Sequence, residues 1–172
     1  IYYARQAHDE APKEPYYAHM LADLLRSADR PADAKEVYRT LLSRFPENQE
    51  TRLALARLQA ELGEFQQALR TYEQLIDSAN RPQPEAYAEM LELYREVGNE
   101  EGLERTLKTL IELRRNMPIY QDLLGQLYTH QDRYEEAIPL FEALLRKEPE
   151  NPRLLSQLKM LYTETGQAEK AQ

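Results

Sequence analysis

Cysteine and tryptophan are both missing from this sequence, and glycine is scarce, with 5 residues in 172. Without cysteine there can be no disulfide, no thiolate nucleophile and no cysteine-ligated zinc, and this absence fits the cytosol, the periplasm and a mitochondrion equally. No apolar run approaches the roughly 20 residues that a membrane-spanning helix needs, so direct insertion into a membrane is not expected. The isolated glycines form no phosphate-binding loop.

The sequence is also poor in positive charge: it has 22 Lys and Arg residues but 30 Asp and Glu residues, which gives a formal net charge of −8. A nucleic-acid-binding protein gathers positive charge on one face. Here the basic residues are scattered among acids, so nucleic acid is not an expected partner. No stretch alternates apolar and polar residues with β-branched enrichment, and Ala, Leu, Glu, Gln and Arg are abundant. The composition therefore predicts an all-α chain.

A period of 34 residues runs through the sequence, as in Tyr94, Tyr128 and Tyr162. Four further columns share this interval, with one extra residue between the second and third units. They are Leu21, Leu55, Met90, Leu124 and Leu158; Ala34, Ala68, Leu103, Ala137 and Ala171; Tyr38, Tyr72, Leu107 and Phe141; and Leu41, Leu75, Leu110 and Leu144. The extra residue falls near Pro82 and Pro84, which break a helix and lengthen a connection.

Each unit has the pattern of two amphipathic helices joined by a short polar turn. In residues 118–151, Leu124 and Tyr128 mark the first apolar stripe, and Ala137 and Phe141 mark the second. The matching turn in other units holds a glycine, namely Gly63, Gly98 and Gly166. Glycine suits the left-handed conformation that ends many helices. Neither helix can bury its stripe alone, so we expect successive pairs to stack and form a continuous core.

The pattern resembles the tetratricopeptide repeat, whose signature is W-x2-L-G-x2-Y, then A-x3-F, then P. The best match is Leu124, Gly125, Tyr128, Ala137, Phe141 and Pro149, with Gln121 in the tryptophan position. The resemblance implies an all-α, right-handed α-solenoid of antiparallel helix pairs. It predicts four repeats, at 15–48, 49–82, 84–117 (divergent) and 118–151. Residues 1–14 then read as the second helix of a truncated preceding repeat, and 152–172 as the first helix of a truncated following repeat.

Two local features carry expectations of their own. Pro139 lies inside the second helix of the unit 118–151, past the first turn. Because proline removes a backbone hydrogen bond there, we expect a bend, or a helix that begins closer to Pro139.

A second feature is the tyrosine cluster near the start, Tyr2, Tyr3, Tyr16 and Tyr17. It reads either as an aromatic binding patch or as a face that packs against a further helix of a longer array.

Catalytic groups do not converge in this sequence. The histidines, His8, His19 and His130, lie in different repeats without acids at metal-ligand spacing, so we interpret them as surface residues rather than a metal site. Its serines lack the context of a nucleophile elbow. We therefore expect no enzyme, no metal and no cofactor within these residues.

The resemblance implies that the first helices of successive repeats line a concave groove, the usual ligand surface of the family. Four glutamates of the third unit, Glu85, Glu89, Glu92 and Glu96, occupy an arc of roughly 60° on one helix face, because each residue advances about 100°. They lie opposite the apolar side and form an acidic stripe in the predicted groove. The remaining predicted groove residues are Arg57, His19, Asp122 and Gln126.

Two interpretations of the stripe stay open: a solvated helix face, or a recognition strip for a basic peptide. Like charges four residues apart slightly destabilise a helix, so the stripe has a small cost without an obvious structural benefit. Some family members hold acidic chaperone tails through basic first-helix residues. Here Asp23 and Glu92 would repel a carboxylate at the corresponding positions, which argues against that ligand.

The leading functional hypothesis is a protein–protein interaction scaffold whose groove binds a peptide or domain of a partner. A first alternative is a structural spacer or self-association segment of a larger assembly, such as a bacterial exopolysaccharide secretion or outer-membrane assembly protein, with self-association through the two truncated ends. A second is the regulatory repeat region of an enzyme whose catalytic domain lies outside the sequence.

Overall fold

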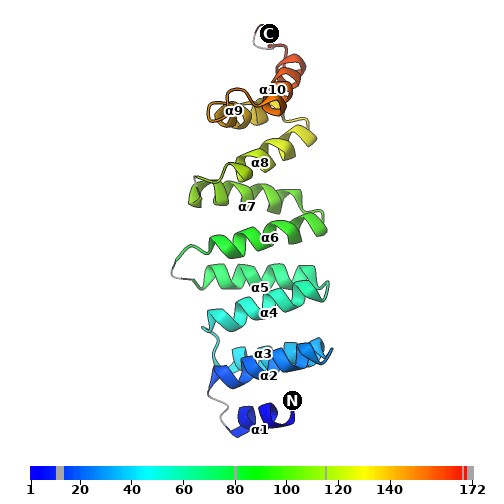
Figure 1. The fold of residues 1–172 in the computed structure, drawn as a ribbon, viewed down its shortest axis with the longest axis vertical. Coiled ribbons are helices and arrows are strands. Elements are labelled where there is room, and N and C mark those ends of the chain that lie inside the picture. Colours follow the sequence, from blue (N-terminus) through cyan, green and yellow to red (C-terminus); the bar gives the residue numbers. More distant parts are fainter. Residues whose placement is uncertain (11–13, 80, 115, 168, 170–172) are drawn as a thin grey trace. The chain divides into compact units, whose positions relative to one another are not determined.

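The computed structural model describes the chain except residues 11–13, 80, 115, 168 and 170–172 and the side chain of His8. Ten α-helices and no strand lie in these described residues (Figure 1). The helices are α1 (Tyr2–Glu10), α2 (Pro15–Ser27), α3 (Pro31–Arg44), α4 (Gln49–Glu61), α5 (Phe65–Asp77), α6 (Pro84–Glu96), α7 (Glu100–Leu113), α8 (Pro118–His130), α9 (Tyr134–Leu145) and α10 (Pro152–Glu164). The all-α class predicted from the sequence is confirmed.

The chain divides into two compact units, Ile1–Val97 and Gly98–Gln172. In the first unit, α1 to α6 form a stack in which each helix packs against the next and neighbouring helices run in opposite directions (Figure 1). In the second unit, α7 to α10 also pack in sequential order. The boundary falls inside the segment 84–117, the most divergent of the predicted repeats.

Most helices begin at a residue suited to a helix N-terminus. Five of them, α2, α3, α6, α8 and α10, have proline in the first turn, where its missing N–H would have had no intrahelical partner. Asn48, Asn99 and Asn151 cap α4, α7 and α10 by accepting backbone N–H groups with their side-chain oxygens. The helix boundaries are thus set largely by local sequence.

The turns that follow the first helices, α2, α4, α6, α8 and α10, each contain one residue in the left-handed region. Gly63, Gly98 and Gly166 have φ values of 72°, 65° and 71°, which confirms the prediction for these glycines. Asp29 and Asp132 take the same conformation, with φ values of 58° and 57°. Asp tolerates this region better than most residues because its short polar side chain can hydrogen-bond locally.

The periodic columns supply the core. The leucine column Leu21, Leu55, Met90, Leu124 and Leu158 is at most 6% exposed. In the second helices, Tyr38, Tyr72 and Phe141 are at most 2% exposed. Four polar residues are buried with them, and two of these, Gln59 and Thr71, bond to each other between α4 and α5.

Pro139 does not displace the start of the helix that contains it. Helix α9 begins at Tyr134 and continues through Pro139 to Leu145. A start closer to the proline is therefore not observed, and the bend stays a prediction.

The two end segments are described only in part. In the segment 1–14, α1 covers Tyr2–Glu10, and residues 11–13 lie outside the description. In the segment 152–172, α10 ends at Glu164, and residues 168 and 170–172, with Ala171 among them, lie outside it.

Candidate interaction surface

The predicted groove residues all lie on first helices, but they divide between the two units. His19, Arg57 and the four glutamates are on α2, α4 and α6 of the first unit. The other two, Asp122 and Gln126, are on α8 of the second unit. The two groups therefore belong to separate compact units.

Helix α6 has two opposite faces, as its sequence predicts. Ala86, Met90, Leu91, Leu93 and Tyr94 are buried. Three of the four stripe glutamates, Glu85, Glu92 and Glu96, are exposed. The fourth, Glu89, is half-buried, with 32% of its side chain exposed. The solvent-facing stripe is therefore interrupted at Glu89.

Glu89 is held by two residues from other helices. From α4, Arg57 Nε donates to Oε2 at 2.9 Å and Nη2 donates to Oε1 at 2.5 Å. From α5, the hydroxyl of the buried Tyr72 donates to Oε2 at 2.5 Å. The Arg57 hydrogen bonds, with a smaller contribution from Tyr72, lower the pKa of Glu89 against the opposing effect of burial. Burial, followed by the Glu89 hydrogen bond, raises the pKa of Tyr72.

His19 also bonds to the next first helix. Its Nε2 lies 2.9 Å from Oγ1 of Thr51 on α4. Its ring centroid is 5.3 Å from that of Tyr38 on α3. Burial and then the nearby Asp23 carboxylate raise the pKa of Tyr38. The half-buried His19 therefore forms part of the packing between α2, α3 and α4.

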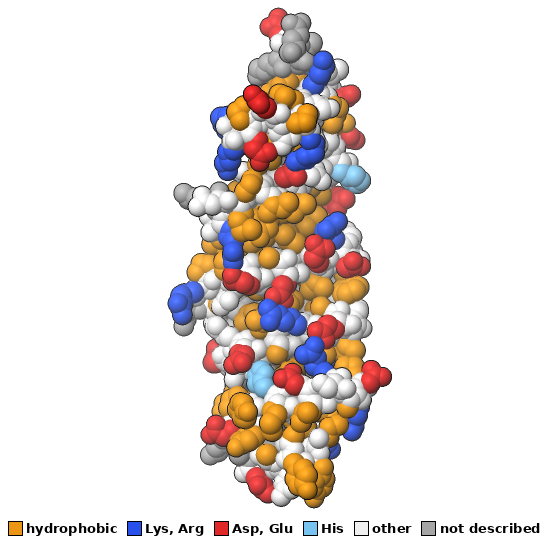
Figure 2. All heavy atoms as spheres, viewed as in Figure 1, with side chains coloured by type: hydrophobic (Ala, Val, Ile, Leu, Met, Phe, Trp, Pro, Cys, Tyr) orange, Lys and Arg blue, Asp and Glu red, His pale blue; other side chains and the backbone are white. Residues whose placement is uncertain are grey.

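Charged residues on the first helices pair with one another more than the sequence alone indicated. Arg26 on α2 makes two hydrogen bonds of 2.8 Å to Glu61 on α4. Within α6, Arg95 lies 3.3 Å from Glu92. Figure 2 shows acidic and basic side chains interspersed over the face that it presents. The surface of the first unit is a mixed array of charges in which α6 has an excess of acid.

In the second unit, the two predicted residues contact each other. Asp122 accepts a hydrogen bond of 2.8 Å from Gln126 Nε2 and another of 2.8 Å from Arg153 Nη2 on α10. Only 15% of the Asp122 side chain is exposed. Arg153 was not singled out by sequence reasoning, although it follows Asp122 by about one repeat length. Asp122 thus links α8 to α10.

Sequence reasoning also missed a set of bonds between tyrosines of first helices and glutamates of the helix before. Tyr94 donates to Glu73 at 3.2 Å, Tyr128 to Glu104 at 3.0 Å and Tyr162 to Glu142 at 2.7 Å. Burial, followed by the Glu142 hydrogen bond, raises the pKa of Tyr162 to about 12. The available signal was a glutamate 20 to 24 residues before each of these tyrosines.

Glu104 of α7 is the most heavily bonded of these glutamates. It accepts from Arg133 Nη1 at 2.6 Å and from Lys108 Nζ at 2.6 Å, as well as from Tyr128. The guanidinium carbon of Arg133 lies 4.2 Å from the centroid of the Tyr128 ring. Hydrogen bonds from Arg133, and then from Lys108 and Tyr128, lower the pKa of Glu104 to about 2 despite partial burial. This cluster joins α7, α8 and the turn before α9.

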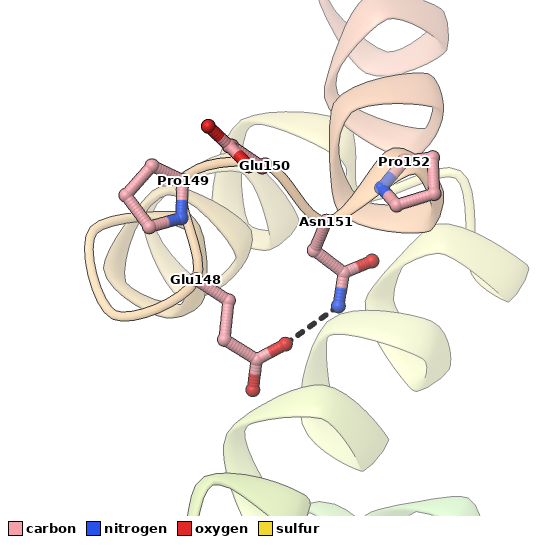
Figure 3. A pocket seen from close by; sticks show the side chains of 5 residues that line it. All are labelled: Glu148, Pro149, Glu150, Asn151 and Pro152. Atoms are coloured by element: carbon pink, nitrogen blue, oxygen red, sulfur yellow. Dashed lines mark hydrogen bonds between the residues drawn. The ribbon is translucent and has the colours of Figure 1, made fainter.

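A hollow at the connection between α9 and α10 is lined by Glu148, Pro149, Glu150, Asn151 and Pro152 (Figure 3). The Asn151 side-chain nitrogen donates to Glu148 Oε2 at 2.6 Å. The side-chain oxygen of Asn151 accepts hydrogen bonds from the backbone N–H groups of Arg153 and Leu154. Both ends of the amide are therefore used to hold the connection and cap α10, and we assign no ligand to this hollow.

The histidines do not form a shared site in the described residues. His19 and His130 belong to different units, and the side chain of His8 lies outside the description. No group of three or more His, Asp or Glu residues in the described part of the chain is placed to hold a metal ion. None of the described helices is both long and apolar enough to cross a bilayer.

Sequential helix pairs with left-handed turns and buried periodic columns define a repeat protein of the tetratricopeptide class. The family model for the tetratricopeptide repeat matches residues 25–88 and 128–172, more than half of the chain. The chain belongs to this family, which confirms the resemblance read from the sequence. Proteins of this family are in general scaffolds for protein–protein interaction rather than enzymes.

Solved structures support the same fold. A MamA protein is 19% identical, with a TM-score of 0.65 over 90% of this chain and 84% of that one. YrrB, described as a TPR protein with an unusual peptide-binding site, is 15% identical, with a TM-score of 0.69 over 98% and 86% of the two chains. A tetratricopeptide repeat protein from Parabacteroides merdae is 23% identical, with a TM-score of 0.63 over 98% and 66%. At these identities the likeness shows the fold alone. No curated protein sequence matches.

Proposed function

We propose that this chain is an interaction scaffold whose first-helix surface binds a peptide or domain of a partner protein. The observation that carries the proposal is the exposed side of α6, where Glu85, Glu92 and Glu96 face solvent while the opposite side is buried. The fold of YrrB, a protein described as having a peptide-binding site, is consistent with this role. We further propose that residues 15–48, 49–82, 84–117 and 118–151 are four tetratricopeptide repeats.

The partner segment that this surface favours is basic. Helix α6 contains four glutamates and one arginine. Its charges are open to a ligand at Glu92, whose side chain is 71% exposed, more than at Glu89, which Arg57 already neutralises. Complementary charge across an interface mainly sets specificity and association rate. A partner with lysine or arginine in an extended segment would match this surface.

Fluorescence anisotropy with labelled Gly/Ser peptides tests the proposal, using arginine-bearing, lysine-bearing and uncharged versions. The basic peptides should bind, and their binding should weaken as salt screens the charges. Changing Glu92→Lys should weaken binding by about fivefold, the upper range for one exposed charge pair. Glu112→Lys, at an exposed glutamate of the second helix α7, is the matched control. If E92K and E112K bind the basic peptides with equal affinity, α6 is not part of the binding surface.

Self-association is a second candidate, supported by the aromatic residues of α1 and α2. Tyr2, Tyr3 and Tyr16 are 76%, 81% and 70% exposed, and exposed apolar clusters commonly mark interfaces. Light scattering coupled to size exclusion measures the assembly state directly. A dimer that Tyr3→Ser converts to monomer would support this function, whereas a concentration-independent monomer would exclude it.

A further inference from the structure

Glu89 differs from the neighbouring first-helix carboxylates because two nitrogens of one guanidinium bond to it. Arg57 approaches Glu89 side-on, with Nε and Nη2 directed at different oxygens, at 2.9 and 2.5 Å. This two-point arrangement is the geometry by which carboxylates recognise arginine and cannot be matched by the single ammonium of lysine. Glu92, in contrast, lies 3.3 Å from a single nitrogen of Arg95.

The Glu89 carboxylate is fixed from behind by a buried group. Tyr72 is 1% exposed and directs its hydroxyl at Oε2 over 2.5 Å. This bond comes from α5, whereas Arg57 comes from α4, so the carboxylate keeps one anchor when the guanidinium leaves. A side chain whose orientation is set by a buried neighbour is ready to bind without further ordering.

Arg57 itself can be reached from solvent. Its side chain is 51% exposed, against 32% for Glu89. Exposed ion pairs contribute little to stability because water competes for both charges. Replacing one guanidinium by another on the same carboxylate would therefore cost the fold little.

We propose that Glu89 is an arginine-binding position and that Arg57 is its internal occupant, which competes with an arginine of the partner. This inference rests on the proposed function and specifies it: the basic partner is recognised through arginine, and the chain reduces its own affinity for that partner. Binding would exchange Arg57 for the incoming guanidinium while Tyr72 holds the carboxylate in place.

The test compares Arg57→Gln with Arg39→Gln in the anisotropy assay. Arg39 is a matched control because it is similarly exposed, at 43%, and pairs with Glu36 on the second helix α3. Both changes remove one positive charge, but only R57Q frees Glu89. We expect R57Q to bind the arginine peptide about fivefold more tightly than the unmodified chain, the upper range for release of one exposed pair. The lysine peptide should gain less, and R39Q should show a small equal gain for both peptides.

A third variant, Glu89→Gln, should abolish the preference for arginine over lysine. Far-ultraviolet circular dichroism establishes that each variant is folded. If R57Q unfolds, Arg57→Lys takes its place, because it keeps the charge but loses the two-point contact, and should gain about twofold for the arginine peptide.

The outcomes separate this inference from the function on which it rests. Equal gains for R57Q and R39Q, or equal gains for the arginine and lysine peptides, would overturn the role of Arg57 while leaving basic-peptide binding intact. The absence of any binding by the unmodified chain and by R57Q would overturn both proposals.

Discussion

The position that a Cβ atom would take at Gly125 lies 2.7 Å from Cζ of Phe141 and 2.8 Å from its Cε2. The Phe141 ring is fully buried, at 0% exposure, so it has no open space to move into. Gly125 on α8 and Phe141 on α9 occupy the small and aromatic positions of the repeat signature. The two helices are close here because the first helix has no side chain at this point.

Gly125→Ala should therefore destabilise the second unit by up to about 2 kcal/mol, because overpacking a core costs about 1 to 3 kcal/mol and alanine gains about 1 kcal/mol over glycine in a helix interior. Urea unfolding followed by circular dichroism measures this loss. Adding Phe141→Leu to G125A should recover part of the loss, because the smaller side chain makes room for the new methyl group. A G125A protein that is about 1 kcal/mol more stable than the original would show that α8 and α9 separate without cost.

The left-handed turns give a pair of opposite predictions. Asp29→Gly should stabilise the first unit by about 0.5 to 1 kcal/mol, because glycine adopts a φ of 58° without steric cost. Gly63→Ala should destabilise it by about 1 kcal/mol. Apart from the adjacent residues of the chain, no heavy atom lies within 4 Å of the added Cβ at Gly63, so this loss would come from the backbone conformation and not from a clash. In thermal unfolding, the midpoint temperature should rise for Asp29→Gly and fall for Gly63→Ala.

The buried bond between Thr71 and Gln59 should depend on both partners. Thr71 Oγ1 donates to Gln59 Oε1 at 2.7 Å, and the residues are 8% and 4% exposed. Thr71→Val should cost about 1 to 3 kcal/mol, because the Gln59 amide would lose a partner in a site that water does not reach. The double change T71V with Gln59→Leu should be close to neutral. A double-mutant cycle in urea measures the coupling energy between Thr71 and Gln59. If the stability losses of the two single variants simply add in the double variant, the predicted coupling is wrong.

Glu104 should make the second unit sensitive to acid. Its pKa is about 2 in the folded chain, against about 4.3 for a free glutamate. Because the folded-state pKa is the lower one, the stabilisation is complete above about pH 4.3 and is lost as pH falls toward 2. Glu104→Gln should be less stable at neutral pH and should show a flatter dependence of unfolding free energy between about pH 5 and 2. Glu112→Gln is the control, and equal slopes for the two variants would contradict this role.

The repeating pattern was enough to predict the all-α class and many core positions. The 34-residue columns identified buried residues such as Leu124 and Phe141, because these positions depend only on the periodicity of the sequence. The glycine turns were predicted for the same reason. The turns at Asp29 and Asp132 were not predicted to be left-handed, since aspartate adopts many conformations and only the surrounding helices select this one.

The contacts of the candidate surface residues were predicted less well, because they depend on how helices are aligned with one another. Helical periodicity correctly placed Glu85, Glu92 and Glu96 on the exposed side of α6. It also placed Glu89 there, but the bonds from Arg57 and Tyr72 depend on three helices and on residues 32 and 17 positions earlier. The tyrosine–glutamate bonds also depend on the alignment of two helices. They were missed because burial of the tyrosine rings already explained these residues, so no partner was sought for their hydroxyl groups.

The pairs that join successive first helices give the repeats a fixed order. Arg26 pairs with Glu61, Arg57 with Glu89, and Asp122 with Arg153, so within each of the two units a first helix carries a charge that pairs with the next first helix. In the proposed repeat numbering, deleting residues 49–82 would remove Arg57 and put Asp23 opposite Glu89, replacing an attraction with a repulsion. Although the repeats share one fold, they are therefore not interchangeable, and an array shortened by this repeat would require a new charge opposite Glu89.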